Sequence, residues 1–214
     1  MTLVNFLIRP GNLPVLGLIG ALLFFSSAEA VSEKELMAPA IQPVYRINLR
    51  VHLANSGRTP EEFEPIFLEI NKIWHSQAGI CFEIHTVYHD TPLSDGLDMW
   101  FAPDIGAYNG YYDGEYIYMS DAPILAPAEN PAGSSAARTA AHELGHALDL
   151  PHRQESDDNL MRSRTYGWQL NAQEIQQARE SAADIAIEDT LPLNCGSPKI
   201  RPKEAPSAAP LLQG

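Results

Sequence analysis

The chain has 214 residues, of which 45% are hydrophobic and 19% are charged, and this composition supports one folded core of ordinary size. Its formal net charge of −13 argues against nucleic acid and anionic lipid as partners, because both would be repelled by an acidic surface.

The N-terminus carries the features of an export signal. A short apolar run at residues 13–25 follows the lone Arg9, and Ala28-Glu29-Ala30 supplies an A-x-A cleavage site. The run is short for a membrane span, so we predict a signal peptide of residues 1–30, with an uncleaved N-terminal anchor as the alternative. The mature protein is then expected to be secreted or periplasmic, with no membrane association after cleavage.

The first part of the mature chain predicts a strand and a helix. Residues 31–42 are expected to be a flexible segment, and residues 43–195 a single domain. Apolar and polar side chains alternate over residues 44–53, which is typical of a half-buried strand. Thr59-Pro60-Glu61-Glu62 is a capping box with proline at the first helical position, and the apolar stripe that follows predicts a helix to about Gln77.

Three more strands are expected before the next helix. Gly79 ends the first helix, and residues 80–89 form the second strand. Residues 97–101 and 115–119 predict two short strands, and the Gly-, Asn- and Tyr-rich residues 103–114 between them predict a loop.

Two helices and a tail complete the prediction. Ser134 or Ser135 can cap an alanine-rich helix that extends to about Leu148. A second capping box, beginning at Asn171, opens a helix to about residue 187. The side chains expected to face inward from this helix are Ile175, Ala178, Ala182 and Ile185. Residues 196–214 are rich in Pro, Ala and Ser and are expected to be a disordered tail.

The chain contains two cysteines, Cys81 and Cys195. An even count in an oxidising compartment suggests one disulfide, which would tie the C-terminal end to the middle of the sheet. Two free buried thiols are the alternative. Neither cysteine has the spacing of a thiolate metal site.

The strongest chemical signal is the stretch from His142 to His152. His142 and His146 are four residues apart and would point their rings to one side of a helix, with Glu143 directly after the first. His152 can reach the same point only if the helix stops and the chain turns, for which Asp149-Leu150-Pro151 is suited.

Three imidazoles leave the fourth position of a tetrahedral zinc open for water, as in a catalytic site. The alternative is an alanine-rich core helix that carries unconnected histidines.

This stretch resembles the metzincin metalloproteases, whose pattern is H-E-x-x-H-x-x-G-x-x-H followed by a methionine turn. The pattern is matched by His142, Glu143, His146 and His152. Asp149 stands where the family usually has glycine, and aspartate is among the few residues that tolerate a positive φ. Met161, nine residues after His152, resembles a short Met-turn of the matrixin type, whose role in the family is an apolar floor under the ligands.

The resemblance implies an α+β fold with a twisted mixed sheet and two helices in an N-terminal subdomain, a small C-terminal subdomain with one helix, and a zinc cleft between them. It also implies that residues 115–119 form the edge strand beside the cleft, where an extended substrate could pair. An ordinary paired strand is the alternative.

The implied chemistry is hydrolysis. His142, His146 and His152 would hold one Zn²⁺, and Glu143 would act as general base toward a water activated by the metal. Candidate walls of a substrate pocket are Tyr166, Trp168, Tyr116 and Tyr118. Calcium is a second candidate ion that nothing in the sequence supports.

We therefore predict a monomeric, secreted zinc endopeptidase that acts on proteins or peptides. Three alternatives remain at this point: a zinc protease whose third ligand is Glu174, a catalytically silent zinc-binding interaction domain, and a zinc hydrolase acting on a non-peptide amide or ester.

Overall fold

The computed structural model describes residues 42–92, 95–124, 134–164, 167–187 and 195, all within the unit Ser32–Gly214. The predicted signal peptide, nearly all of the predicted flexible segment, the predicted tail and Tyr166 lie outside the described residues. Within the described ranges, no helix combines the length and the apolar character that a bilayer crossing requires.

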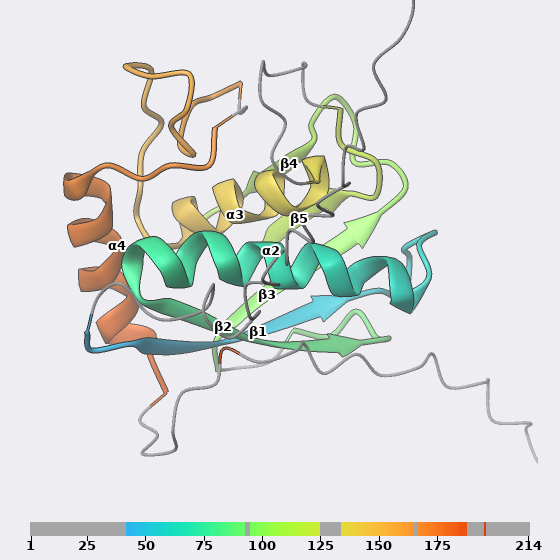
Figure 1. Ribbon diagram of the computed structural model, residues 1–214. Coiled ribbons are helices and arrows are strands. Elements are labelled where there is room, and N and C mark those ends of the chain that lie inside the picture. Colours follow the sequence, from blue (N-terminus) through green and yellow to red (C-terminus); the bar gives the residue numbers. More distant parts are fainter. Residues whose placement is uncertain (1–41, 93–94, 125–133, 165–166, 188–194, 196–214) are drawn as a thin grey trace, which may run out of the picture. The chain divides into compact units, whose positions relative to one another are not determined.

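A five-stranded mixed sheet forms the centre of the fold (Figure 1). Its strand order is β2-β1-β3-β5-β4, with β4 antiparallel to β5 and all other neighbours parallel. The strands are β1 (Tyr45–His52), β2 (Ile80–Val87), β3 (Leu97–Ala102), β4 (Gly110–Tyr112) and β5 (Ile117–Ser120).

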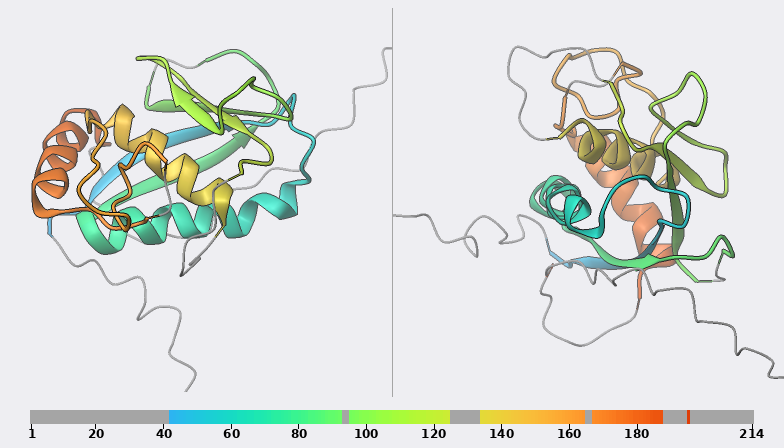
Figure 2. Two further views of the ribbon diagram at one scale, coloured as in Figure 1. Left: turned by 90° about the horizontal axis from the view of Figure 1, so that it is seen from above. Right: turned by 90° about the vertical axis from the view of Figure 1, so that its right-hand side faces the viewer.

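Helices α2 (Pro60–Ala78) and α3 (Ser135–Ala147) lie side by side on one face of this sheet (Figure 2). The predicted capping box begins α2, and Gly79 ends it in the left-handed conformation with φ 63°. The third helix, α4 (Ala172–Ile185), packs against β1 and α2. The predicted α+β fold is confirmed. Two helices, α2 and α3, precede the turn that leads to His152, and α4 follows it.

The hydrophobic core lies between the sheet and the two helices. Alternate strand residues that face the helices are completely or almost completely buried, namely Ile47, Leu49, Val51, Met99, Phe101, Ile117 and Met119. Trp74 of α2 fills the space beside α3 and donates a hydrogen bond from its indole Nε1 to the Ala141 carbonyl at 3.2 Å. Burial of this apolar face sets the position of α3 and therefore of its histidines.

The opposite face of the sheet is more buried than the alternation in β1 predicts. Arg50 and His52 are only 5% and 1% exposed, although the pattern assigned them to the solvent side. Both bind the buried carboxylate of Asp98, Arg50 through two hydrogen bonds of 2.9 Å and His52 through one of 2.7 Å. A buried polar face needs such pairing, because unpaired charges away from water are costly.

A ladder of aromatic rings crosses the same face. His52, Trp100, Tyr118 and Tyr111 are register partners on four adjacent strands. Their rings stack in sequence, with centroid distances of 4.1, 5.7 and 4.8 Å. Cross-strand stacking of this kind stabilises strand pairing, and here it fixes the register of the short outermost strand β4.

Strand β4 corrects two expectations. The predicted loop 103–114 contains this strand, and β5 is therefore an inner strand, so the expectation that residues 115–119 form the sheet edge is wrong. Three residues are too few to show a period of two, which explains why the pattern missed β4.

The disulfide between Cys81 and Cys195 is confirmed, with a Cα–Cα distance of 5.6 Å. Cys81 lies on β2, an outer strand, so the disulfide does not reach the middle of the sheet as expected. In the chain-entropy model, closing so long a loop stabilises the fold by about 4–5 kcal/mol. The expected inward position of Ile185 is also wrong, since this residue at the end of α4 is 40% exposed.

Candidate active site

Helix α3 carries the first two histidines on one side. Ser134 caps the helix as predicted, because its hydroxyl accepts a hydrogen bond from the Ala137 amide at 3.0 Å. The four-residue spacing then brings the rings of His142 and His146 together, with centroids 4.7 Å apart.

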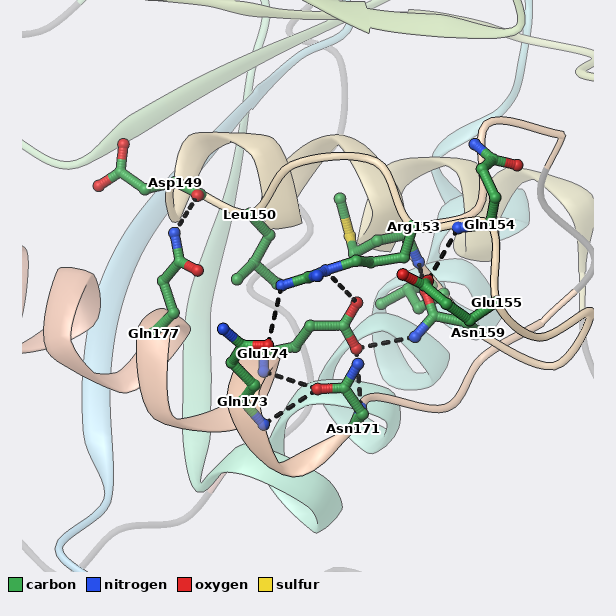
Figure 3. Close-up of polar contacts among 12 residues, drawn as sticks. Asp149, Leu150, Arg153, Gln154, Glu155, Asn159, Asn171, Gln173, Glu174 and Gln177 are labelled. Atoms are coloured by element: carbon green, nitrogen blue, oxygen red, sulfur yellow. Dashed lines mark hydrogen bonds and ion pairs between the residues drawn. The ribbon is translucent and has the colours of Figure 1, made fainter.

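The turn after α3 brings back the third histidine. Asp149 has φ 62°, as expected for the position where the family pattern has glycine. The amide of Leu150 donates to the Gly145 carbonyl at 2.9 Å, which closes the end of the helix. Two residues of α4 donate to Asp149. The Gln177 side-chain amide donates to its carbonyl (Figure 3), and the Ser181 hydroxyl donates to its carboxylate at 2.9 Å.

The three Nε2 atoms of His142, His146 and His152 lie 3.1–3.2 Å from one another. They form a group that could hold a metal ion. A tetrahedral zinc with Zn–N distances of about 2.0–2.1 Å separates its ligand nitrogens by about 3.3–3.4 Å, so the geometry fits.

The opposite ring nitrogens set the protonation of two of these histidines. Nδ1 of His142 faces the Leu160 carbonyl at 2.7 Å, and Nδ1 of His146 faces the Leu150 carbonyl at 2.8 Å. Because a carbonyl only accepts, each Nδ1 must donate, and a neutral ring then keeps its lone pair on Nε2. Burial lowers the pKa of His142 to about 4 and also lowers the pKa of His146, which favours the neutral, metal-binding form.

Met161, the residue predicted to form a Met-turn, packs closely against Gly145 of α3. It is completely buried, and a Cβ on Gly145 would overlap its sulfur and its terminal methyl carbon. The close approach of Met161 favours glycine at this position, although glycine weakens an isolated helix by about 1 kcal/mol.

Glu143 lies between α3 and β4. Its side chain is 6% exposed, and burial raises the pKa of the carboxyl to about 7, against the opposing effect of a hydrogen bond from the Tyr112 amide. A dication at the three histidines would lower this pKa. On β4, a Cβ on Gly110 would lie 3.0 Å from Cγ of Glu143 and 2.9 Å from Thr139, so glycine allows the strand to approach the helix.

A cavity of about 600 Å³ connects the histidines with Glu143 and β4. Its walls consist of Ala107, Tyr108, Asn109, Gly110, Tyr111, Tyr112, Ile124, Thr139, His142, Glu143, His146, His152, Ser163 and Arg164. The sequence interpretation missed the contributions of β4, Thr139, Ser163 and Arg164. The Gly-Tyr-Tyr run of β4 is the one local signal that could have indicated a short strand here.

Three of the four predicted pocket residues belong to the described part of the chain, and these three lie outside the cavity. Tyr116, Tyr118 and Trp168 do not line the described part of this cavity. The ring of Tyr118 stacks between Trp100 and Tyr111 on the opposite face of the sheet, and Tyr116 packs edge-on against Trp100.

The alternative hypothesis, in which Glu174 is the third metal ligand, is wrong. Its carboxylate is completely buried and bound to the side chain of Asn159 and the amide of Asn171, whereas His152 occupies the ligand position.

Comparison with known proteins gives a distant structural likeness. Neither a family model nor a curated protein matches the chain. Among solved structures, mature mirolysin of Tannerella forsythia in complex with a cleaved peptide is similar, at 14% identity and a TM-score of 0.38. The likeness covers 58% of this chain and 70% of the mirolysin chain.

The described residues thus combine an α+β fold, built on a five-stranded mixed sheet with three helices, with three histidines that converge on one point. Both features are those that the resemblance to metzincin metalloproteases implied.

Proposed function

We propose that this protein is a secreted, zinc-dependent endopeptidase. The observation that carries the proposal is the convergence of three Nε2 atoms in one cavity with a buried glutamate and the outermost strand β4. Imidazole ligands suit zinc, copper, iron and nickel, and a three-histidine set with an open position is that of a hydrolytic zinc site.

His142, His146 and His152 would hold the ion. Zinc bound in this way lowers the pKa of a water ligand to about 7 and polarises a carbonyl oxygen. Glu143 would accept the proton from the attacking water and return it to the leaving nitrogen. The carbonyl groups of Leu160 and Leu150 keep two of the rings in the tautomer that leaves Nε2 free.

Strand β4 favours a peptide over a small amide or ester. Among the described strands it pairs with β5 alone, and its three residues all line the cavity. Apart from the Tyr112 amide, which donates to Glu143, the other side of such a strand offers backbone groups to an extended peptide, which would bind by strand addition. A small ester needs no such edge.

The test is a digest of a peptide library by the purified protein, with and without a chelator, followed by sequencing of the products. We expect cleavage that the chelator abolishes and added zinc restores. Glu143→Ala should keep zinc and lose activity by about 10²–10⁴-fold, the usual contribution of a general base. Glu180→Ala, which changes an exposed glutamate of α4, is the control and should cleave normally.

Near-normal cleavage by Glu143→Ala would contradict the mechanism. Stoichiometric zinc without cleavage of any peptide would favour the silent interaction domain, and hydrolysis of esters alone would favour the non-peptide hydrolase.

Export is the second part of the proposal. The disulfide between Cys81 and Cys195 supports it, because such bonds persist in oxidising compartments. N-terminal sequencing of the protein recovered from outside the cytoplasm should begin at Val31; an intact Met1 there would contradict the predicted cleavage.

A further inference from the structure

We propose that Glu174 of α4 is a positioning residue for the candidate metal centre, and that it acts through the Met-turn, defined here as residues 157–161. The proposal rests on the proposed function, since ring placement matters only if the three histidines bind zinc.

Glu174 is the third residue of α4 and part of its capping box. One carboxylate oxygen, Oε2, accepts from the Asn171 amide at 2.7 Å, which is the ordinary cap contact. The same oxygen accepts a hydrogen bond of 2.8 Å from the side-chain amide of Asn159 (Figure 3). Asn159 lies in the Met-turn. The carboxylate therefore joins α4 to the segment that contacts His142.

Asn159 carries this contact to a histidine. Its side-chain oxygen accepts from the Met161 amide at 2.8 Å, which fixes the backbone on either side of Leu160. The Leu160 carbonyl is the group that faces Nδ1 of His142 at 2.7 Å. Glu174 thus determines where the partner of His142 lies, and second contacts of this kind orient a ligand ring.

A second contact reaches the other side of the turn. The Arg153 amide, next to His152 in the chain, donates to the Met161 carbonyl at 2.8 Å, and the Arg153 guanidinium donates to Gln173 of α4 at 3.2 Å. Nε of Arg153 lies 4.0 Å from Oε1 of Glu174. The residue that follows His152 is therefore held by both the Met-turn and α4.

Burial of this carboxylate is more than a helix cap requires. Glu174 is completely buried, and its Oε1 has no hydrogen-bond partner among the described residues. The corresponding residue of the α2 capping box, Glu62, accepts from the Thr59 amide at 2.7 Å and is exposed. A carboxylate can therefore cap a helix from the surface, whereas Glu174 is buried with Oε1 balanced by the Arg153 guanidinium at 4.0 Å and without a hydrogen bond among the described residues.

The test compares Glu174→Ala and Asn159→Ala with Glu62→Ala, which removes the same cap contact away from the histidines. Zinc affinity is measured by competition with a chromophoric chelator, and the fold of each metal-free variant is checked by near-UV circular dichroism. We expect both site variants to bind zinc about 10–100-fold more weakly, the usual effect of losing such a supporting contact. Glu62→Ala should bind as the wild type does, and Glu174→Gln, which keeps an acceptor for Asn159, should recover most of the affinity.

If Glu174→Ala does not fold, Asn159→Ala decides the matter, because it breaks the relay and leaves the cap intact. Folded Asn159→Ala with wild-type zinc affinity would overturn the inference and leave the proposed function untouched. A wild-type protein that binds no zinc would overturn both.

Discussion

The fold holds histidines in two regions in opposite ways. In the histidine triad (His142, His146 and His152), the Nε2 atoms face one another, and the Nδ1 atoms of His142 and His146 face carbonyl groups. In the sheet cluster (Arg50, His52 and Asp98), Nδ1 of His52 faces the His89 carbonyl at 2.6 Å and Nε2 faces Asp98 at 2.7 Å.

The comparison shows which contacts suit a histidine for binding a metal ion. Both ring nitrogens of His52 face acceptor oxygens of the protein, so neither nitrogen is directed at a point that it shares with other histidines. In the triad, each described carbonyl contact takes one proton and leaves one lone pair directed at the same point. Burial alone does not separate the two regions, since His52 is 1% exposed and His142 is 5% exposed. The two regions differ in the atoms that the ring nitrogens contact.

The largest expected break in this comparison is loss of a ligand. Structural zinc sites bind with about 10–16 kcal/mol over four ligands, so one ligand contributes about 2.5–4 kcal/mol. His146→Ala should therefore weaken zinc binding by about 10²–10³-fold and abolish any cleavage, as measured by chelator competition and peptide digestion. His52→Gln, the matched change in the sheet cluster, should leave zinc affinity unchanged. Equal losses in the two variants would mean that the regions are not independent.

Removal of a charge from the sheet cluster should lower the free energy of unfolding and leave zinc affinity unchanged. Asp98→Ala leaves Arg50 and His52 without their shared carboxylate, and breaking a buried ion pair costs about 3–5 kcal/mol of unfolding free energy. Urea unfolding measures the loss. The folded variant should retain wild-type zinc affinity, and a weaker affinity would show that the cluster supports the metal centre.

Gly145→Ala tests the packing of Met161 against α3 next to His146. Alanine normally favours a helix over glycine by about 1 kcal/mol, but here its methyl group would overlap Met161. Overpacking costs about 1–3 kcal/mol, so we expect a net loss of unfolding free energy and a weaker zinc affinity. A more stable variant would show that Met161 has room to move away.

The smallest effect concerns a third kind of buried histidine. His75 of α2 is 3% exposed, neither ring nitrogen has a hydrogen-bond partner among the described residues, and burial lowers its pKa below 6.5. As the pH falls through 6.5 the unfolded chain binds a proton that the folded chain does not, so folded stability should decrease until the lower folded-state pKa is reached. His75→Leu should reduce this loss, measured by urea unfolding of the metal-free protein at pH 7.5 and 5.5. An unchanged slope between these pH values would exclude His75 as a contributor.

Much of the fold followed from local patterns. The capping boxes at Thr59 and Asn171 placed the starts of α2 and α4, because the residues that satisfy the free amides of a helix lie within one turn. Strand β4 and the burial of Arg50 did not follow from such patterns. A three-residue strand shows no period, and alternation in β1 cannot tell whether its polar face will be covered.

The sequence by itself determined the convergence of the three histidines, since the four-residue spacing of His142 and His146 and the left-handed turn at Asp149 are properties of the local backbone. Only the tertiary structure decided what surrounds them. The Leu160 carbonyl on His142, the contact of Glu174 with the Met-turn and the approach of Gly110 to Glu143 all join residues of different elements. Such contacts depend on how the helices pack on the sheet, and no local pattern in the chain records that packing.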